Sequence, residues 1–363
     1  MEDFFCFTLS NLEARIGALG KEKYRARQLF RWVYKLGNLN FNEMTNIPKG
    51  LRTVFSEMFS LGPMPITGEF PSGDGSVKLA FTARDGETIE SVIMPEKNRM
   101  TLCVSTQIGC RMGCKFCVTG KIGFRRNLGA GEIVGQLISA REYLKRKNES
   151  PVTNLVFMGM GEPLDNSENV MAALDILKDP NGLDLSYRKI TLSSVGLIDG
   201  LTMLDAKSAV IAISLNAADD DTRSMLMPIN RLYPIEKIMD FVRNFKGTKR
   251  TRITFEYILI KGINDSPEDA RHLADLLKDV KCKINLIPYN PSPYTDFERP
   301  DREVVDRFHQ YLLDRYFTVI IRDSRGQDVS AACGQLGMNY LNSDPSNSVN
   351  SHNKRPLFPE VTA

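Results

Sequence analysis

The sequence is poor in the features that would place it in several common classes. It has 363 residues but only three histidines, one tryptophan and no apolar run near the roughly 20 residues of a membrane-spanning helix. Glu2 and Asp3 stand near the start, where a secretory signal would carry positive charge. The seven cysteines are unevenly spaced, which fits a reducing compartment better than a disulfide framework. We therefore expect a cytoplasmic protein with no membrane partner.

Strong charge of one sign is also missing, because the formal net charge is only +3. A field of that size does not by itself indicate a nucleic-acid partner. Hydrophobic residues make up 42% and charged residues 25% of the chain, which is ordinary for a globular protein. The length fits one large domain with an appendage.

One short run of cysteines carries most of the chemical information. Cys110, Cys114 and Cys117 are separated by three and then two residues in a glycine-rich stretch. Thiolates are soft ligands that suit zinc, copper(I) or iron–sulfur clusters. A four-iron cluster usually takes four cysteines, so three would leave one iron open to another ligand. This spacing resembles the signature of radical S-adenosylmethionine (SAM) enzymes, in which SAM fills the open position.

Spacing alone leaves two other interpretations of the run. The cysteines could be packed thiols, as most free cysteines are. They could also form part of a zinc site, which needs a fourth ligand that is usually Cys or His. His272, His309 and His352 all lie far along the chain from the run.

The hydrophobic pattern changes character along the chain. Helices are predicted over Leu9–Leu19, Ala26–Leu36 and Gly50–Phe59, and a break rich in proline and glycine follows. Two strands joined by an Asp-Gly turn then predict a hairpin, Val77–Ala83 with Thr88–Met94.

From Thr101 onward, predicted strands and helices alternate. The strands are Leu102–Thr106, Thr153–Met158, Lys189–Ser193, Val210–Leu215, Ile253–Leu259, Ile284–Pro288 and Thr318–Arg322. The helices include Ala130–Arg146, Glu168–Lys178, Pro234–Asn244, Pro267–Lys278 and Arg302–Tyr316. This alternation predicts an α/β fold with a parallel sheet and helices outside it. The active site is expected at the carboxyl ends of the strands, and the cysteine run follows the first of them.

Two local patches are basic. The stretch from Lys21 to Lys35 holds six basic residues with aromatic residues among them, and that from Arg111 to Arg126 holds five basic residues and no acid. Basic side chains interleaved with aromatic ones suit contact with phosphates and stacking on bases. An amphipathic helix with a buried aromatic face and a solvent-exposed basic face has the same pattern.

Several longer motifs stand in order along the chain. They are Cys103-Val-Ser-Thr-Gln-Ile-Gly-Cys110, Thr119-Gly-Lys-Ile-Gly-Phe124, Met158-Gly-Met-Gly-Glu162-Pro163, Met227-Pro-Ile-Asn230, Asn285-Leu-Ile-Pro-Tyr-Asn290-Pro291 and Asp328-Val-Ser-Ala-Ala-Cys333-Gly-Gln-Leu336. Together they closely resemble the bacterial adenine-C2 RNA methyltransferases of the RlmN family, radical SAM enzymes of dual specificity for 23S rRNA and tRNA.

The resemblance implies an organisation. It implies an N-terminal helical RNA-binding accessory domain (residues 1–62), a β-hairpin linker (63–100) and a partial TIM-like (β/α)6 radical SAM barrel (101–340). The remaining residues, 341–363, are polar and rich in Pro, Ser and Asn, a composition typical of a disordered tail.

The resemblance also implies a chemistry. One 4Fe-4S cluster is held by Cys110, Cys114 and Cys117, and two SAM molecules are used per turnover. Cys333 accepts a methyl group from one SAM, and the cluster reduces a second SAM to a radical that takes hydrogen from this methyl group. The sulfur-bound methylene radical adds to the base. Cys103 then attacks the sulfur of Cys333 and leaves a disulfide, and Glu90 matches the family's proton acceptor. From sequence alone, Glu90 could equally be a carboxylate at a strand edge.

The SAM-binding residues are likewise implied by the resemblance. They are Gly161 and Glu162, which match a segment that holds the amino end of SAM, with Ser193, Ser214, Leu215, Asn216 and Asn290. Some relatives have His where this chain has Asn216, so a backbone contact is expected there more than a side-chain contact. Each of these polar residues could instead cap a helix or stabilise a turn.

The implied partners are 23S rRNA, tRNA and an electron donor such as flavodoxin, and the chain is expected to be a monomer. Two other functions remain open. One is methylation of adenine carbon 8 in 23S rRNA, as in the related Cfr methyltransferases, which share the cluster and both reactive cysteines. The other is a zinc-dependent RNA-binding protein without catalysis, in which the Gly-Glu-Pro segment and Cys333 have no role.

Overall fold

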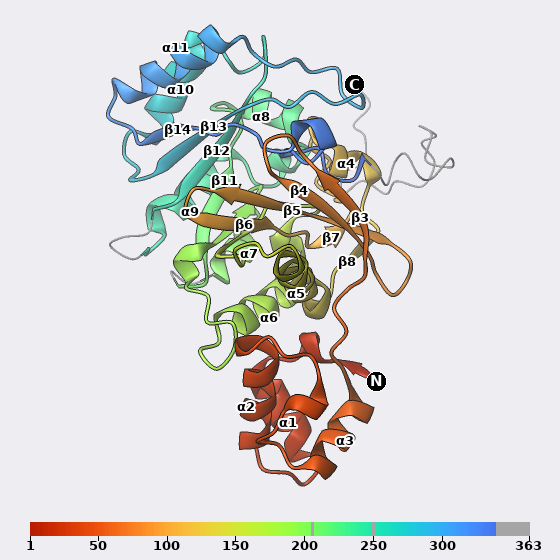
Figure 1. Ribbon diagram of the computed structural model, residues 1–363. Coiled ribbons are helices and arrows are strands. Elements are labelled where there is room, and N and C mark those ends of the chain that lie inside the picture. Colours follow the sequence, from red (N-terminus) through yellow and green to blue (C-terminus); the bar gives the residue numbers. More distant parts are fainter. Residues whose placement is uncertain (205–206, 248–251, 339–363) are drawn as a thin grey trace.

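A single mixed sheet organises the chain. The computed structural model describes residues 1–204, 207–247 and 252–338. Ten described strands lie in the order β14-β13-β12-β11-β10-β9-β6-β5-β4-β3. From β6 to β14 all neighbours are parallel, whereas β3 to β6 pair antiparallel. The α/β class expected from the alternation is confirmed (Figure 1).

The parallel part matches the predicted strands closely. Its strands are β6 (Arg99–Cys103), β9 (Asn154–Phe157), β10 (Ile190–Ser194), β11 (Val210–Ser214), β12 (Thr254–Leu259), β13 (Lys283–Pro288) and β14 (Val319–Ile321). The connecting helices are α5 (Ala130–Arg146), α6 (Ser167–Lys178), α7 (Ile198–Thr202), α8 (Asp220–Leu226), α9 (Ile235–Asn244), α10 (Pro267–Leu277) and α11 (Arg302–Leu313). A short helix, α4 (Val118–Ile122), directly follows the cysteine run.

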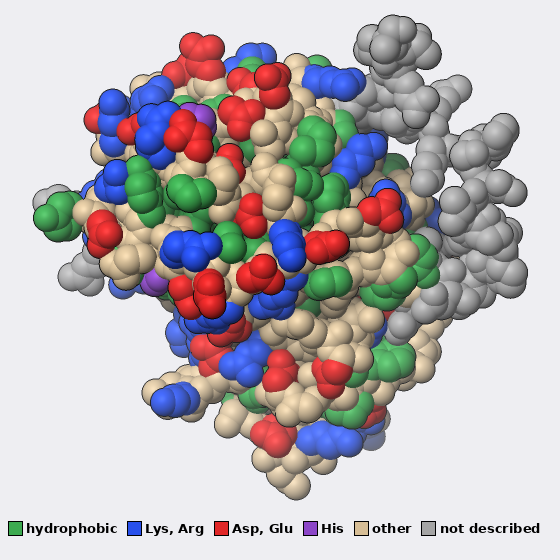
Figure 2. Space-filling model, turned by 90° about the horizontal axis from the view of Figure 1, so that it is seen from above, with side chains coloured by type: hydrophobic (Ala, Val, Ile, Leu, Met, Phe, Trp, Pro, Cys, Tyr) green, Lys and Arg blue, Asp and Glu red, His purple; other side chains and the backbone are tan. Residues whose placement is uncertain are grey.

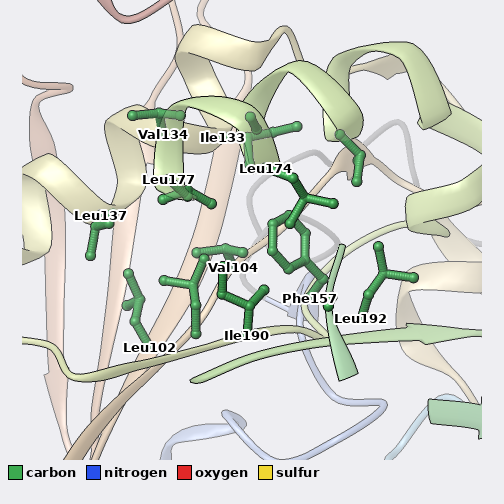
Figure 3. Packing of buried hydrophobic residues seen from close by; sticks show 14 of the residues in the cluster. Leu102, Val104, Ile133, Val134, Leu137, Phe157, Leu174, Leu177, Ile190 and Leu192 are labelled. Atoms are coloured by element: carbon green, nitrogen blue, oxygen red, sulfur yellow. The ribbon is translucent and has the colours of Figure 1, made fainter. Parts of the chain in front are cut away.

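The core forms where α5 and α6 cover one face of this sheet. Strand residues including Leu102, Phe157 and Leu192 meet helix residues including Val134 and Leu174 (Figure 3), and all five are at most 1% exposed. Both helices present apolar residues at helical spacing, which gives each a single stripe to bury. Removal of this apolar surface from water is the main force that holds the layers together.

The predicted hairpin belongs to the same sheet. β4 (Val77–Thr82) and β5 (Thr88–Glu96) pair antiparallel, and β5 then pairs with β6. One further strand, β3 (Ile66–Pro71), was missed because its proline- and glycine-rich surroundings indicated a break. Its pairing with β4 is irregular between Ile66 and Gly68, at the glycine that suggested the break.

The N-terminal residues form a helical unit at the opposite end of the molecule from α10 and α11 (Figure 1). It contains α1 (Leu9–Gly17), α2 (Tyr24–Phe30), a π-helical turn over Arg31–Lys35 and α3 (Lys49–Met58). Its hydrogen bonds to the remainder of the chain include one from Lys35 Nζ to the Pro180 carbonyl at 3.3 Å and one from Arg141 Nη1 to the Tyr34 carbonyl at 3.5 Å.

The described residues leave some expectations open. The domain boundaries at residues 62 and 100 stay a prediction, and the tail at 341–363 lies outside the described residues. Within the described ranges, no helix has both the length and the apolar character needed to cross a bilayer.

The first prediction concerns the core between α6 and the sheet. Leu174 is fully buried, so Leu174→Ala should lower the free energy of unfolding by roughly 2–5 kcal/mol through lost burial and a residual cavity. Urea unfolding followed by circular dichroism measures it. Met203→Ala, at a side chain that is 53% exposed, is the control and should change stability little. Equal effects of the two substitutions would contradict this account of the core.

Candidate active site

The parallel strands end around one cleft, and the predicted site residues gather there. Its wall includes the cysteine run, the segment after β9, the ends of β10 and β11, side chains of β12 and β13, and residues that follow β14. The carboxyl ends of successive parallel strands meet at one edge of a sheet, which explains why residues far apart in sequence share this cleft.

All three cysteines of the run line the cleft. Cys110, Cys114 and Cys117 belong to a loop whose backbone is closely packed, because Gly109 has a φ of +70° and an added Cβ would meet the Gly123 carbonyl oxygen. Burial raises the pKa of all three thiols. Metal binding must therefore displace their protons.

The donor set fits an iron–sulfur cluster. No group of three or more His, Cys, Asp or Glu side chains in the described ranges is arranged to hold a metal ion. Cys110, Cys114 and Cys117 nevertheless line one cleft, and cysteine thiolates are the usual ligands of an iron–sulfur cluster. Soft thiolates with an open side toward a cleft suit a four-iron cluster that keeps one iron accessible.

Cys103 and Cys333 meet at a second, smaller cavity beside the cleft. Cys103 is the last residue of β6 and is buried, and burial raises the pKa of its thiol to about 12. Cys333 is half-buried and lines both the cleft and the smaller cavity. Both thiols are free in this structure. The two cysteines that the resemblance implies are therefore brought together, although 230 residues separate them in sequence.

Glu162 lies at the base of the cleft in a buried position. Its Oε2 accepts a hydrogen bond from the Val195 amide at 2.9 Å and its Oε1 accepts one from the Leu164 amide at 3.1 Å. Burial raises the pKa of Glu162 to about 7, even though these donors lower it. A carboxylate has further lone pairs beyond those two bonds, so it can still accept a hydrogen bond from a ligand ammonium group.

The preceding residue, Gly161, is fixed by geometry. Its φ is +96°, and a Cβ there would lie 2.5 Å from the Gln107 side chain. Gln107 in turn accepts a hydrogen bond from the Glu162 amide at 2.8 Å. A glycine at this position therefore sets the direction in which Glu162 enters the cleft.

The other expected SAM residues divide into two groups. Ser193, Ser214 and Asn216 line the cleft, whereas Leu215 is fully buried in the hydrophobic core and is not part of the cleft wall. Asn216 has a positive φ of +60°, which Asn tolerates. Its side-chain Oδ1 accepts a hydrogen bond from the Ile258 backbone amide at 2.9 Å, and its Nδ2 donates to Met227 Sδ at 3.1 Å. These bonds support the expectation that this position contributes through its backbone.

Asn290 lies outside the cleft wall and contacts the segment that carries Cys333. Its Nδ2 donates to the Cys333 carbonyl at 3.2 Å, and its buried Oδ1 has no hydrogen-bond partner. Glu90 lines neither cavity. It is buried on β5, where its Oε2 accepts a hydrogen bond from the Gly337 amide at 2.8 Å. Both residues therefore contact the segment around Cys333.

Sequence reasoning missed two charged residues of the cleft. Glu256 on β12 has a buried Oε2 without a hydrogen-bond partner, and Arg322 Nη1 lies 3.9 Å from this oxygen. Arg322 lines both the cleft and the smaller cavity. A glutamate within the apolar strand Thr254–Leu259 was the available signal, because ionisable residues are rarely buried without a partner or a function.

Comparison with known proteins first defines the class. The family model of the radical SAM superfamily matches residues 104–277, and that of the ribosomal RNA large subunit methyltransferase N-terminal domain matches residues 3–61. A crystal structure of a radical SAM methyltransferase from Sphaerobacter thermophilus superposes with a TM-score of 0.86 at 42% identity. The superposed part covers 92% of this chain and 99% of the Sphaerobacter chain.

Curated relatives then define the family. The dual-specificity RNA methyltransferase RlmN of Geotalea uraniireducens is 44% identical over 331 residues, or 91% of this chain and 95% of that protein. Its counterpart from Geobacter sulfurreducens is 45% identical over 337 residues, which is 93% of this chain and 92% of the relative. The chain belongs to the RlmN family of radical SAM RNA methyltransferases.

Membership of this family establishes the cofactors. The enzyme uses a 4Fe-4S cluster and SAM, and the thiols and the carboxylate of the cleft fit these two groups chemically. The comparisons do not favour the carbon-8 alternative, and they give no support to a zinc-binding protein without catalysis.

The second prediction concerns the three cysteines. Cys110→Ala, Cys114→Ala and Cys117→Ala should each lose most of the iron, which in the unsubstituted protein should reach about four atoms per chain after anaerobic reconstitution. Iron analysis and visible absorbance measure it. Cys282→Ala, at a cysteine outside the cleft, is the matched control and should retain the iron. Equal iron in a triplet variant and the control would contradict the ligand assignment.

Proposed function

We propose that this enzyme methylates carbon 2 of a specific adenosine in 23S rRNA and of an adenosine in tRNA anticodon loops, through a methyl group carried by Cys333. The observation that carries the proposal is the shared cavity of Cys103 and Cys333 beside the cysteine-lined cleft. The names of the relatives, which specify dual-specificity RNA methyltransferases, support the two RNA substrates.

The cofactors supply what protein groups alone cannot. Carbon 2 of adenine lies between two ring nitrogens and is electron-poor, so it cannot attack the methyl group of SAM as an amine would. When bound, the cluster and SAM supply the one-electron chemistry that such a carbon requires. The three thiolates of the run would hold the cluster, and Glu162 would bind the ammonium group of SAM through a charge-assisted hydrogen bond.

The chain's own thiols divide the transfer into two steps. Cys333, exposed to both cavities, carries the one-carbon unit and presents it to the base. Cys103, as the thiolate, then attacks the sulfur of Cys333, and a Cys103–Cys333 disulfide forms as the bond from that sulfur to carbon breaks. The electron pair of the broken bond stays with the one-carbon unit, which takes up a proton to become the methyl group of the product. A buried thiol with a pKa of about 12 is a poor nucleophile until it loses its proton, so Cys103 needs a nearby acceptor or charge. Arg322, which lines the same cavity, favours the thiolate.

Glu90 and the remaining polar residues complete the proposed site. Glu90, which lies behind the segment around Cys333 and lines neither cavity, would accept the proton lost from the ring once the base is bound. Ser193, Ser214 and the backbone at Leu215 and Asn216 would bind SAM. Asn290 would act on Cys333 through its carbonyl, in keeping with the contact described above.

The RNA is expected to dock on the N-terminal helices. Phe30 and Tyr34 are buried there, as in an ordinary amphipathic helix, but Arg27, Arg31 and Lys35 are exposed, and Arg27 also pairs with Glu13 at 2.9 Å. In the second basic patch several cations are paired with acids. Arg126, for example, lies 2.8 Å from Glu132. On the face seen in Figure 2, acidic and basic side chains alternate, so this face has no extended basic surface.

We further propose that the enzyme is a cytoplasmic monomer reduced by a flavodoxin-like donor. A free thiol pair that cycles through a disulfide needs a reducing compartment, and this supports the location.

The third prediction tests the methyl carrier and the ring position together. The reconstituted enzyme with SAM, reductant and unmodified 23S rRNA fragments should yield 2-methyladenosine in nucleoside mass spectrometry. Cys333→Ala should yield none, and Cys103→Ala should leave RNA covalently attached through Cys333. Cys6→Ala is the matched control and should retain activity. Product from Cys333→Ala, or 8-methyladenosine from the unsubstituted enzyme, would overturn the proposal.

The fourth prediction tests the RNA surface. Arg27→Glu with Arg31→Glu should weaken RNA binding and reduce the slope of log affinity against log salt by about two, one for each phosphate contact. Filter binding at several salt concentrations measures it. Arg302→Glu with Arg307→Glu on α11 is the charge-matched control, at the opposite end of the molecule. If both double variants bind RNA with the same affinity and the same salt dependence, the assignment of RNA docking to the N-terminal helices is wrong.

A further inference from the structure

Two buried charges hold the ends of the segment that carries Cys333. Lys78 Nζ on β4 donates to the Ser330 carbonyl at 3.5 Å, three residues before Cys333. Glu90 on β5 accepts from the Gly337 amide at 2.8 Å, four residues after it. The loop 330–337, called here the methyl-carrier loop, is therefore attached at both ends to one hairpin.

The two charges also contact each other. Lys78 Nζ lies 3.7 Å from Glu90 Oε1, and each side chain is 1% exposed. In the β4–β5 ladder Glu90 is opposite Ala80, two residues from Lys78, so the two side chains share one face. The ammonium also lies 5.0 Å from the centre of the Phe70 ring. Desolvated charges of this kind are costly, and their pairing offsets this cost only in part.

Stability alone is a weak explanation for the pair. A buried ion pair can often be replaced by apolar residues without loss of stability. Moreover, Glu90 Oε1 is buried without a hydrogen-bond partner, so the carboxylate keeps an unused acceptor beside the ammonium. Such an arrangement is typical of a group whose protonation changes during function.

We propose that Lys78 is a positioning residue for methyl transfer. It keeps Glu90 ionised and fixes the Ser330 end of the methyl-carrier loop. Proton uptake by Glu90 then weakens the bond at the Gly337 end and loosens this loop. The inference rests on the proposed roles of Glu90 and Cys333. It links the step in which a proton leaves the base to the step in which the Cys333 sulfur must become accessible to Cys103.

The direction of the pH effect follows from the groups around Glu90. Burial raises the pKa of Glu90, whereas the Lys78 ammonium and the Gly337 amide lower it. Lys78 is the charged group that faces Glu90 in the described residues. Loss of the ammonium therefore raises the pKa of Glu90 further. The methylation rate falls on the acid side of the pH profile as Glu90 becomes protonated, so this fall moves to higher pH.

The fifth prediction tests both halves of the proposal with Lys78→Met and Lys78→Arg. Lys78→Met should move the acid limb of the pH profile of RNA methylation to higher pH. It should also increase amide hydrogen exchange at Gly337 by at least about fivefold, because Glu90 then takes up a proton more readily and the bond that it accepts from Gly337 is roughly twice as strong when Glu90 is charged. Lys78→Arg keeps the charge and should restore most of both properties. Lys97→Met, in an exposed turn, is the control and should match the unsubstituted enzyme.

A measurement on the unsubstituted protein keeps the proposal testable if Lys78→Met does not fold. After correction for intrinsic exchange, the Gly337 amide should lose protection on acidification, as Glu90 takes up a proton. Protection that does not change with pH, or a Lys78→Met variant with an unchanged acid limb and unchanged exchange, overturns the inference.

The two levels of proposal fail differently. If Cys333→Ala still methylates RNA, the proposed function fails, whatever Lys78 does. If Cys333→Ala is inactive while Lys78→Met behaves as the control, only the role of Lys78 is rejected. Glu90→Gln should abolish the pH dependence of Gly337 exchange, and retention of this dependence in Glu90→Gln would assign it to another group and reject the inference.

Discussion

The attachment of the methyl-carrier loop to the cysteine loop is the interaction on which the site depends. The Val118 amide, directly after the last cysteine of the run, donates to the Gly334 carbonyl at 2.7 Å. Thr119 Oγ1 also donates to the Leu336 carbonyl at 2.8 Å. These bonds join the wall of the cofactor cleft to the segment that presents Cys333. A shift of either loop would therefore separate Cys333 from the cleft in which SAM is expected.

A second group of bonds fixes the ends of the strands. Arg223 is fully buried, and its guanidinium donates to the carbonyls of Val195, Ser214 and Leu215 at 2.7, 3.3 and 3.0 Å. These carbonyls lie at the carboxyl ends of β10 and β11, beside the expected SAM residues. One guanidinium with five donors can hold several carbonyls at fixed angles, which an ammonium could not do. Precise ligand geometry at loop positions thus rests on a buried charge.

The sequence predicted the repetitive parts well, for physical reasons. Alternating strands and helices and the Asp-Gly hairpin are local patterns, and the structure confirms them. The cysteine spacing is also a local pattern, and its role as a ligand set stays a prediction. β3 was missed because proline and glycine near Gly68 obscured its strand pattern. The meeting of Cys103 with Cys333 followed only from the resemblance, since no local pattern links residues so far apart. Lys78, Arg223 and Arg322 gave no signal, because burial of a charge depends on partners that the chain supplies elsewhere.

The order of synthesis has a consequence for when this site can exist. The bonds that attach the methyl-carrier loop to the β4–β5 hairpin join residues 252 and 247 positions apart, Lys78 with Ser330 and Glu90 with Gly337. Contacts between such distant residues cannot form until almost the whole chain has left the ribosome, whereas α1 to α3 and the first strands can fold earlier. A nascent chain of this enzyme can therefore already have folded α1 to α3, the helices proposed to dock RNA, while it still lacks the assembled thiol cavity. The thiol cavity is therefore among the last parts of the enzyme to assemble.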